Sequence, residues 1–293
     1  MRGRGYALAA LALGVVAGLT PAAAQEPGTV AAGVIRVDYG RPLPISRLDL
    51  PPEDMGFAGA ELATADNTTT GGFMGQKFTL ETVTVPPDGA VAALNEMIGR
   101  GVQYVVAMAD APEVLAFSDA AGDRALVFNA LAPDDTLRNA DCRANVLHVA
   151  PSRSMETDAL AQFLAWKRWG DWFLIEGSHP ADTALADAYR ASAAKFGQKI
   201  VETRVYEDTG GARRTDSGLV QVQAQMPLFT QSVPDHDVTV VADESAVFAG
   251  FVPYHTWDAR PVVGSAGLRP VTWSPAQEAW GGTQLQSRFE KLA

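Results

Sequence analysis

GQKFTLETVTVPPDGAVAALNEMIGRGVQYVVAMADA, residues Gly75–Ala111, has the pattern of a strand, a helix and a second strand. Residues 75–85 are rich in apolar and β-branched side chains, and Pro86-Pro87 ends this first strand. Asp88 is the expected helix N-cap, and apolar residues recur at three- and four-residue spacing over 91–98. The almost wholly apolar run 102–109 is typical of a strand that helices cover on both faces. This order predicts a right-handed βαβ unit.

Parts of this unit recur later in the chain. GQKIVETRVY (Gly197–Tyr206) resembles the opening strand, and DVTVVADE (Asp237–Glu244) resembles QYVVAMAD (Gln103–Asp110). The repeat predicts two similar lobes, each with its own parallel sheet. Because most regular stretches alternate strand and helix, the fold class is predicted to be α/β with two doubly wound parallel-sheet lobes.

Apolar spacing and capping signals predict the other elements. Asn67–Gly72 is expected to be a polar turn, and Ser154 is expected to cap a helix whose last turn holds Lys167 and Arg168. Strands are expected at 34–38, 125–129, 145–150, 172–175, 237–242 and 247–252, with closing segments at 261–264 and 268–273. Further helices are expected at 54–65, 112–121, 181–196 and 275–292.

The composition limits the classes of function. The chain has 293 residues, of which 47% are hydrophobic, enough for one large or two ordinary domains. Its formal net charge of −11 argues against nucleic acid as a partner, because binding needs cations to neutralise phosphates.

The first 24 residues have the pattern of an export signal. Arg2 and Arg4 precede an apolar stretch over 6–19, and Ala22-Ala23-Ala24 forms an A-x-A cleavage site before Gln25. The alternative is a transmembrane anchor, but the stretch is shorter than the roughly 20 residues that span a bilayer. We therefore expect export to the periplasm and cleavage near Ala24.

Sequence motifs for catalysis or metal binding are absent. There is no GxxxxGK[ST], GxGxxG after a strand, GxSxG or HExxH, so no enzymatic activity, metal or cofactor is predicted. Each histidine is expected on the surface or satisfied in the core, and the single cysteine allows no internal disulfide. These residues are His148, His179, His236, His255 and Cys142.

Polar side chains collect after the predicted strands. In α/β folds ligands bind at the carboxyl ends of strands, and with two lobes the natural site is the cleft between them. Facing one cleft, these groups could bind a polar or cationic ligand, or a hard metal ion through carboxylate oxygens. The alternative for each is a helix cap after a strand. The candidates are Asp110, Asn129, Asp134, Ser178, Trp257 and Asp258.

The turn GGFMGQK (Gly71–Lys77) resembles the GGINGKK of type I periplasmic binding proteins of the leucine/isoleucine/valine-binding kind. The export signal and the two-lobe order resemble them as well. ALVFNALAPDDTLR, ADCRAN, WDARPVVGSAGLRP and WGGTQLQSRFEKLA are more similar to a subgroup that accompanies pyrroloquinoline-quinone (PQQ)-dependent alcohol dehydrogenases. The resemblance implies the substrate-binding component of an ABC-type transporter, with hinged lobes that close on a small polar solute for a membrane permease.

The same resemblance implies a division of the chain. It consists of a signal peptide (1–24), an N-terminal lobe (25–152), a C-terminal lobe (153–273) and a helix (274–293) returning to the first lobe. Family members run on past this end, so the C-terminal part of the fold is expected to be missing. The Ser/Thr-rich loops of amino-acid binders match Asp110-Ala111 and Asn129-Ala130-Leu131 here, which argues against an amino-acid ligand. The rival functions are an exported sensor or accessory protein of alcohol oxidation that binds a cofactor or metal ion, and then a periplasmic enzyme.

Overall fold

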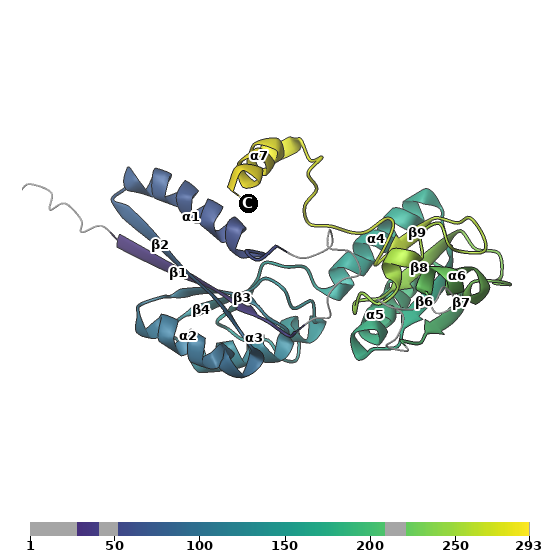
Figure 1. Cartoon of the computed structure of the whole chain (residues 1–293), viewed down its shortest axis with the longest axis horizontal. Coiled ribbons are helices and arrows are strands. Elements are labelled where there is room, and N and C mark those ends of the chain that lie inside the picture. Colours follow the sequence, from purple (N-terminus) through teal and green to yellow (C-terminus); the bar gives the residue numbers. More distant parts are fainter. Residues whose placement is uncertain (1–27, 41–51, 209–220, 293) are drawn as a thin grey trace, which may run out of the picture.

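In the computed structural model of the protein, residues 28–40, 52–208 and 221–292 are described. The expected export signal, residues 1–24, lies outside these ranges. Two lobes, each built on a parallel sheet, follow one another along the chain (Figure 1). The α/β class and the two parallel sheets predicted from the sequence are confirmed. No helix in the described ranges has both the length and the apolar character needed to cross a membrane.

The N-terminal lobe contains a five-stranded sheet in the order β2-β1-β3-β4-β5. Val34 of β1 pairs with Thr82 of β2 on one side and with Val106 of β3 on the other. The predicted βαβ unit is therefore present, with β1 lying between its two strands. The strands are β1 (Gly28–Val37), β2 (Gln76–Val85), β3 (Tyr104–Met108), β4 (Leu126–Asn129) and β5 (Val146–His148).

The C-terminal lobe contains a four-stranded sheet in the order β7-β6-β8-β9. Its β7 takes the edge position that β2 has in the first sheet, and β8 takes the position of β3. These are the strands whose sequences resemble each other, so the repeat reflects equivalent positions in two sheets. The strands are β6 (Asp171–Gly177), β7 (Lys199–Tyr206), β8 (Val238–Ala242) and β9 (Val262–Gly264).

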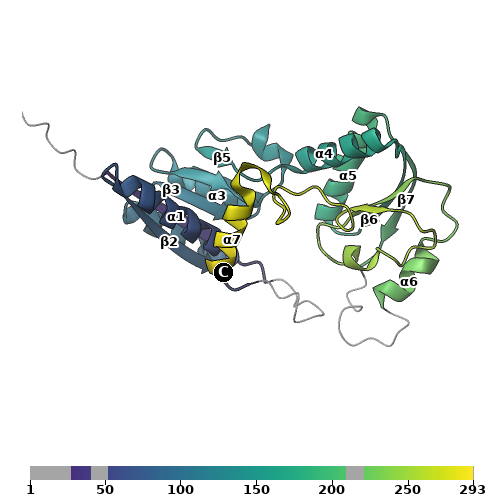
Figure 2. The ribbon, with the colours of Figure 1, turned by 90° about the horizontal axis from the view of Figure 1, so that it is seen from above.

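Helices cover both faces of each sheet (Figures 1 and 2). In the first lobe α2 and α3 pack on one face and α1 on the other; in the second, α4 and α5 pack opposite α6 and η4. After the second lobe the chain returns to the first, where α7 contacts α1. The helices are α1 (Phe57–Gly72), α2 (Ala90–Gly99), α3 (Ala111–Ala121), α4 (Arg153–Lys167), α5 (Pro180–Phe196), α6 (Val222–Phe229) and α7 (Gly282–Leu292), with 3₁₀ turns η2 (Pro87–Gly89), η3 (Asp135–Arg138), η4 (Ala249–Phe251) and η5 (Ala279–Gly281).

Side chains of β6 alternate between two cores. Trp172 and Leu174 point to the face covered by α4 and α5, and Phe173 and Ile175 point to the face covered by α6. All four are essentially without exposure. Full burial of an aliphatic or aromatic side chain contributes roughly 1.5–3 kcal/mol. A strand buried on both faces therefore anchors the second lobe.

Helix α1 is longer than predicted and includes the expected turn at Asn67–Gly72. The side chains of Asn67, Thr68 and Thr69 each donate to the carbonyl four residues earlier, at 2.7–3.0 Å. At the end of the helix Gly71 lies against β2, where an added Cβ would come within 2.4 Å of the Phe78 ring. Tertiary packing and these internal hydrogen bonds overcome the low helix propensity of the segment.

Two predicted helix caps are displaced. Asp88 lies inside η2, and Gly89 is the N-cap residue of α2. Ser152 rather than Ser154 caps α4, because its Oγ accepts a hydrogen bond from Met155 N at 3.4 Å. The hydroxyl of Ser154 donates instead to Asp135 Oδ1 at 2.5 Å, so a contact with the first lobe determines its role.

The segment predicted as a strand at 247–252 forms the 3₁₀ turn η4 instead. The carboxylate of Asp243 accepts hydrogen bonds from the amides of Val247, Phe248 and Ala249 at 2.9, 2.7 and 2.6 Å. Three successive amides aimed at one carboxylate are incompatible with an extended strand. Residues 268–273 form no strand beyond a single bridge from Leu268 to β9, and α7 begins only at Gly282, later than the predicted 275.

Candidate functional site

The carboxyl ends of the two sheets meet at one side chain, Arg153, on the first turn of α4. Its Nη1 donates to Asp134 Oδ1 at 2.8 Å, and Asp134 follows β4 of the first lobe. Its Nε and Nη2 donate to the two carboxylate oxygens of Glu244 at 2.6 Å each, and Glu244 follows β8 of the second lobe. The guanidinium therefore joins the loops that follow one strand of each sheet.

The environment of Arg153 favours its charged form. The side chain is only 11% exposed. Burial alone would lower the pKa of Arg153, but the hydrogen bonds and negative charges of Glu244 and Asp134 outweigh it and raise the pKa. The ion pairs of a buried cation with two carboxylates are costly to break, because removal of one partner leaves a buried charge unpaired. The arrangement is a structural joint between the lobes.

Asp110 lies where the strand order of the first sheet reverses, between β1 and β3. Its backbone N donates to Tyr39 Oη at 2.7 Å, and the Tyr39 hydroxyl donates to Glu113 Oε2 at 2.7 Å. Burial raises the pKa of Tyr39, and the hydrogen bond to Glu113 raises it further, so the phenol stays protonated. Tyr39 thus fixes the backbone of Asp110, an exposed residue at the carboxyl end of the sheet.

Asn129 is fully buried at the end of β4. Its Oδ1 accepts from the amides of Leu131 and Ala132 at 3.2 and 2.9 Å, and its Nδ2 donates to Ala132 O at 2.8 Å and lies 3.1 Å from His148 Nδ1. The amide is therefore committed to the turn that leads toward Asp134. Burial lowers the pKa of His148, and the nearby Arg138 charge lowers it further.

Ser178 lies at the carboxyl end of β6, where the second sheet reverses its strand order. Its Oγ accepts from Asp208 N at 3.0 Å, and the Asp208 carboxylate lies 2.8 Å from His179 Nε2. Behind them the buried Asp182 accepts from the amides of His179 and Ser245 at 3.1 and 2.8 Å. The loops after β6, β7 and β8 are thereby fastened together, and Ser178 is exposed on them.

The predicted grouping of Trp257 and Asp258 with the other four candidates is corrected by the structure. Trp257 N donates to Thr230 Oγ1 at 2.8 Å, and Thr230 directly follows α6, on the way to the amino end of β8. In the same region Arg260 pairs with Asp235 at 2.5 Å. The chain must return to the amino edge of the sheet to begin the parallel strand β9. Trp257 and Asp258 therefore lie at the edge opposite Ser178.

Arg153 and Glu244 are the residues that the six candidates omitted. Glu244 is the second residue after β8 and shares the strand-end signal of the others. Arg153 had a signal too: a cation in the first turn of a helix opposes the helix dipole, which favours anions there. The ion pairs with Asp134 and Glu244 account for this exception.

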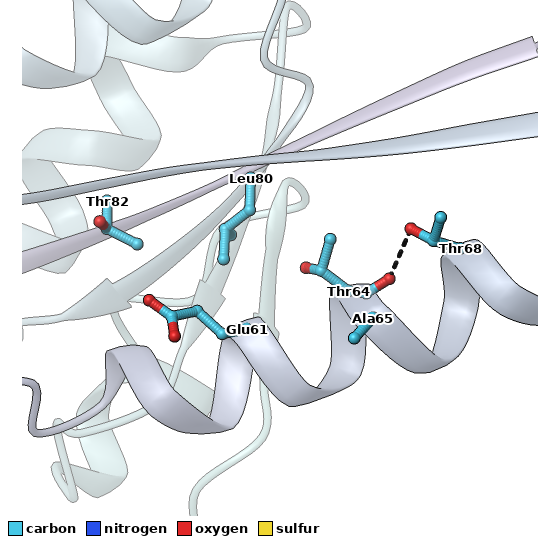
Figure 3. Close-up of a pocket in the computed structure, with 6 residues that line it drawn as sticks. All are labelled: Glu61, Thr64, Ala65, Thr68, Leu80 and Thr82. Atoms are coloured by element: carbon cyan, nitrogen blue, oxygen red, sulfur yellow. Dashed lines mark hydrogen bonds between the residues drawn. The ribbon is translucent and has the colours of Figure 1, made fainter. Parts of the chain in front are cut away.

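Two surface hollows lie away from the lobe junction. One, of about 570 Å³, is lined by α1 and β2, and Figure 3 shows its residues Glu61, Thr64, Ala65, Thr68, Leu80 and Thr82. The hydroxyls of Thr64 and Thr68 donate to helix carbonyls at 2.8 and 2.7 Å, so they are engaged within α1. The other, of about 420 Å³, is lined by polar residues of α7. Within the described ranges no group of three or more His, Cys, Asp or Glu side chains could hold a metal ion.

Comparison with known proteins identifies similar folds. The family model described as periplasmic binding protein matches residues 53–226. A leucine-, isoleucine-, valine-, threonine- and alanine-binding protein from Brucella ovis, in its closed conformation, superposes with a TM-score of 0.65 at 15% identity, over 92% of this chain and 72% of that one. A search of curated sequences gave no match.

Two further solved structures have similar scores. The substrate-binding protein of an ABC transporter from Desulfitobacterium hafniense, in complex with Leu, has a TM-score of 0.61 at 16% identity, over 90% of this chain and 76% of that one. A solute-binding protein from R. palustris in complex with 4-hydroxybenzoate has a TM-score of 0.61 at 12% identity, over 90% and 73%. At sequence identities this low, the similarity to these structures shows the fold alone.

Proposed function

Because the chain belongs to the periplasmic binding protein family, we propose that it is the solute-binding component of an ABC-type transporter and delivers a small polar solute to a membrane permease. Proteins of this family bind solutes and do not transform them, and they are located in the periplasm. The expected export signal, with cleavage near Ala24, agrees with this location.

We propose that the solute binds between the lobes, at the carboxyl ends of the strands. The single observation that carries this proposal is the joint at Arg153, which brings the loops after β4 and β8 to one place. Asp110 and Ser178 are exposed at the two points where the strand orders reverse, and ligands of open parallel sheets bind at such points. Closure of the lobes would then be favoured by ligand contacts to both.

The chemistry of these loops favours a solute other than a free amino acid. The loop after β4 presents no hydroxyl between Asn129 and Leu131, and the Asn129 amide is engaged with its own turn. Four sequence stretches resemble proteins that accompany PQQ-dependent alcohol dehydrogenases, and this resemblance supports a role beside those enzymes. In that role the protein would bind a compound taken up or released during alcohol oxidation.

The test begins with the ligand. Mass spectrometry of compounds released from the purified protein by gentle denaturation identifies what co-purifies, and isothermal titration of that compound measures its affinity. We expect Ser178→Ala and Asp110→Ala to weaken binding, with Trp257→Ala, at the opposite sheet edge, as the control. Catalytic turnover of the compound, or loss of affinity only in the Trp257 variant, would contradict the proposal.

A further inference from the structure

We propose that Arg153 is the pivot that sets the angle between the two lobes, a positioning residue that holds the loop at 133–135 of the first lobe against α4 and against the loop after β8 of the second. This inference rests on the proposed function, because lobe closure is the motion that traps a solute. The chain passes from β5 of the first lobe to α4 of the second through the crossing segment, residues 149–153. The pivot is assigned from the contacts of this segment with both lobes.

The first turn of α4 is bound to the loop at 133–135 through its backbone as well as its side chains. Arg153 N donates to Pro133 O at 2.8 Å, and the next residue donates from Ser154 N to Asp135 Oδ2 at 3.2 Å. With the ion pair of Arg153 to Asp134, these contacts make the loop and the helix turn one unit. A rotation between them would break all of these bonds at once.

The crossing segment is bound to the first lobe just before this unit. Val149 N and Ala150 N both donate to Asn129 O, at 2.9 and 3.3 Å, and Arg138 Nη2 donates to Ala150 O. Residues 149 and 150 are thus bound to Asn129, and Arg153 is bound to the loop at 133–135. Pro151 and Ser152 lie between these two attachment points. Because Ala132 and Leu137, on either side of the loop at 133–135, are buried in the core of the first lobe, this loop moves with that lobe, and a change in the angle between the lobes acts on the contacts of Arg153.

Arg153 extends the unit into the second lobe. Its two contacts with Glu244 are parallel and bidentate, a geometry that fixes the angle of the guanidinium plane. The loop after β8 is in turn tied to β6 and α5 through Ser245 and Asp182. The guanidinium thus transmits the orientation of the second lobe to Asp134, and Asp134 acts in the joint rather than as a free contact for the solute.

The experiment measures the distance between the lobes without any ligand. The exposed Cys142 of the first lobe and an introduced Ala191→Cys on the exposed face of α5 carry two spin labels. Pulsed electron–electron double resonance spectroscopy then gives the distribution of distances between the two labels. We expect Arg153→Met and Asp134→Asn to shift and broaden this distribution. Arg153→Lys should do so to a smaller degree, because an ammonium cannot form the bidentate pair.

Arg190→Met is the matched control, because Arg190 also joins two carboxylates, Glu176 and Asp187, but within the second lobe alone. Its distribution should equal that of the parent protein. Circular dichroism selects variants that fold; should Arg153→Met not fold, the milder Asp134→Asn decides. An unchanged distribution in a folded Arg153 or Asp134 variant overturns the pivot. Since no solute is present, this result is independent of whether the proposed binding function is correct.

Discussion

The hydroxyl of Tyr39 donates a hydrogen bond to Glu113 at 2.7 Å and so joins the end of β1 to the first turn of α3. The same oxygen accepts from the amide of Asp110. One phenol therefore closes the point at which the first sheet reverses its strand order.

Tyr39→Phe tests this junction. The ring keeps its packing, but the Asp110 amide and the Glu113 carboxylate lose their partner. We expect the free energy of unfolding in urea to fall by about 1 kcal/mol, the usual net value of a hydrogen bond. Tyr104→Phe, on the partly exposed start of β3, should change it little. Equal losses in both variants would contradict the role of the Tyr39 hydroxyl.

Gly177→Ala tests the close packing at the end of β6. An added Cβ would meet Asp182 Oδ2 at 2.3 Å, and Asp182 is buried and committed to two amides. Displacing it should lower the free energy of unfolding by roughly 1–3 kcal/mol. Gly170→Ala, where an added Cβ meets nothing within 4 Å, is the control. A melting temperature of the Gly177 variant equal to that of the control would refute this packing argument.

Glu156→Gln should make the protein more stable at neutral pH. Burial raises the pKa of Glu156, and the negative charge of Glu244 raises it further. The folded state therefore holds this proton more tightly than the unfolded state, so stability falls as pH rises from the unfolded pKa of about 4.3 through the folded one. Because a glutamine side chain has no carboxyl group to ionise, the Glu156→Gln variant does not lose stability in this way as the pH rises.

Melting temperatures measured from pH 4 to pH 8 check the sign. The difference between Glu156→Gln and the parent protein should be smallest near pH 4 and grow toward pH 7. Gln162→Ala, an exposed and uncharged change on the same helix, should give a difference that is independent of pH over this range. A stabilisation that grows as the pH falls would show that the sign is wrong.

Asp110→Ala separates a ligand contact from a helix cap. Asp110 precedes α3, yet among the described residues its side chain makes no capping hydrogen bond to that helix. A cap would contribute about 1 kcal/mol to stability, whereas a charge-assisted contact to a solute contributes roughly 1.5–3 kcal/mol to binding. We expect affinity for the co-purifying compound to fall by about tenfold or more. Lowered stability with unchanged affinity would assign Asp110 to the helix instead.

Sequence patterns predicted the fold well where local signals agree with the packing. The alternation of strand and helix identified both sheets, and the likeness of Gly197–Tyr206 to the opening strand identified equivalent edge strands. The prediction of a turn at Asn67–Gly72 is wrong, because its polar side chains form hydrogen bonds within a helix whose end packs against Phe78 of the next strand, β2.

The candidate site was harder to predict, because residue type does not show to which edge of a sheet a loop returns. Trp257 follows the strand β8 in sequence but lies at the amino edge, since β9 has to begin there. Asp134 was selected as a polar strand-end residue, and only its contact with Arg153 reveals a role in the joint. Such a contact depends on the crossing between lobes, which no local pattern encodes.

The return of α7 to α1 affects how the protein is made. Arg288 of α7 pairs with Asp66 of α1 at 2.5 Å, across 222 positions of the chain. At the usual rate of about 5–20 residues per second, a ribosome needs roughly 10–45 s to extend the chain from one partner to the other. For that interval the first lobe lacks α7, and the surface of α1 that α7 contacts is open to chaperones and to neighbouring nascent chains.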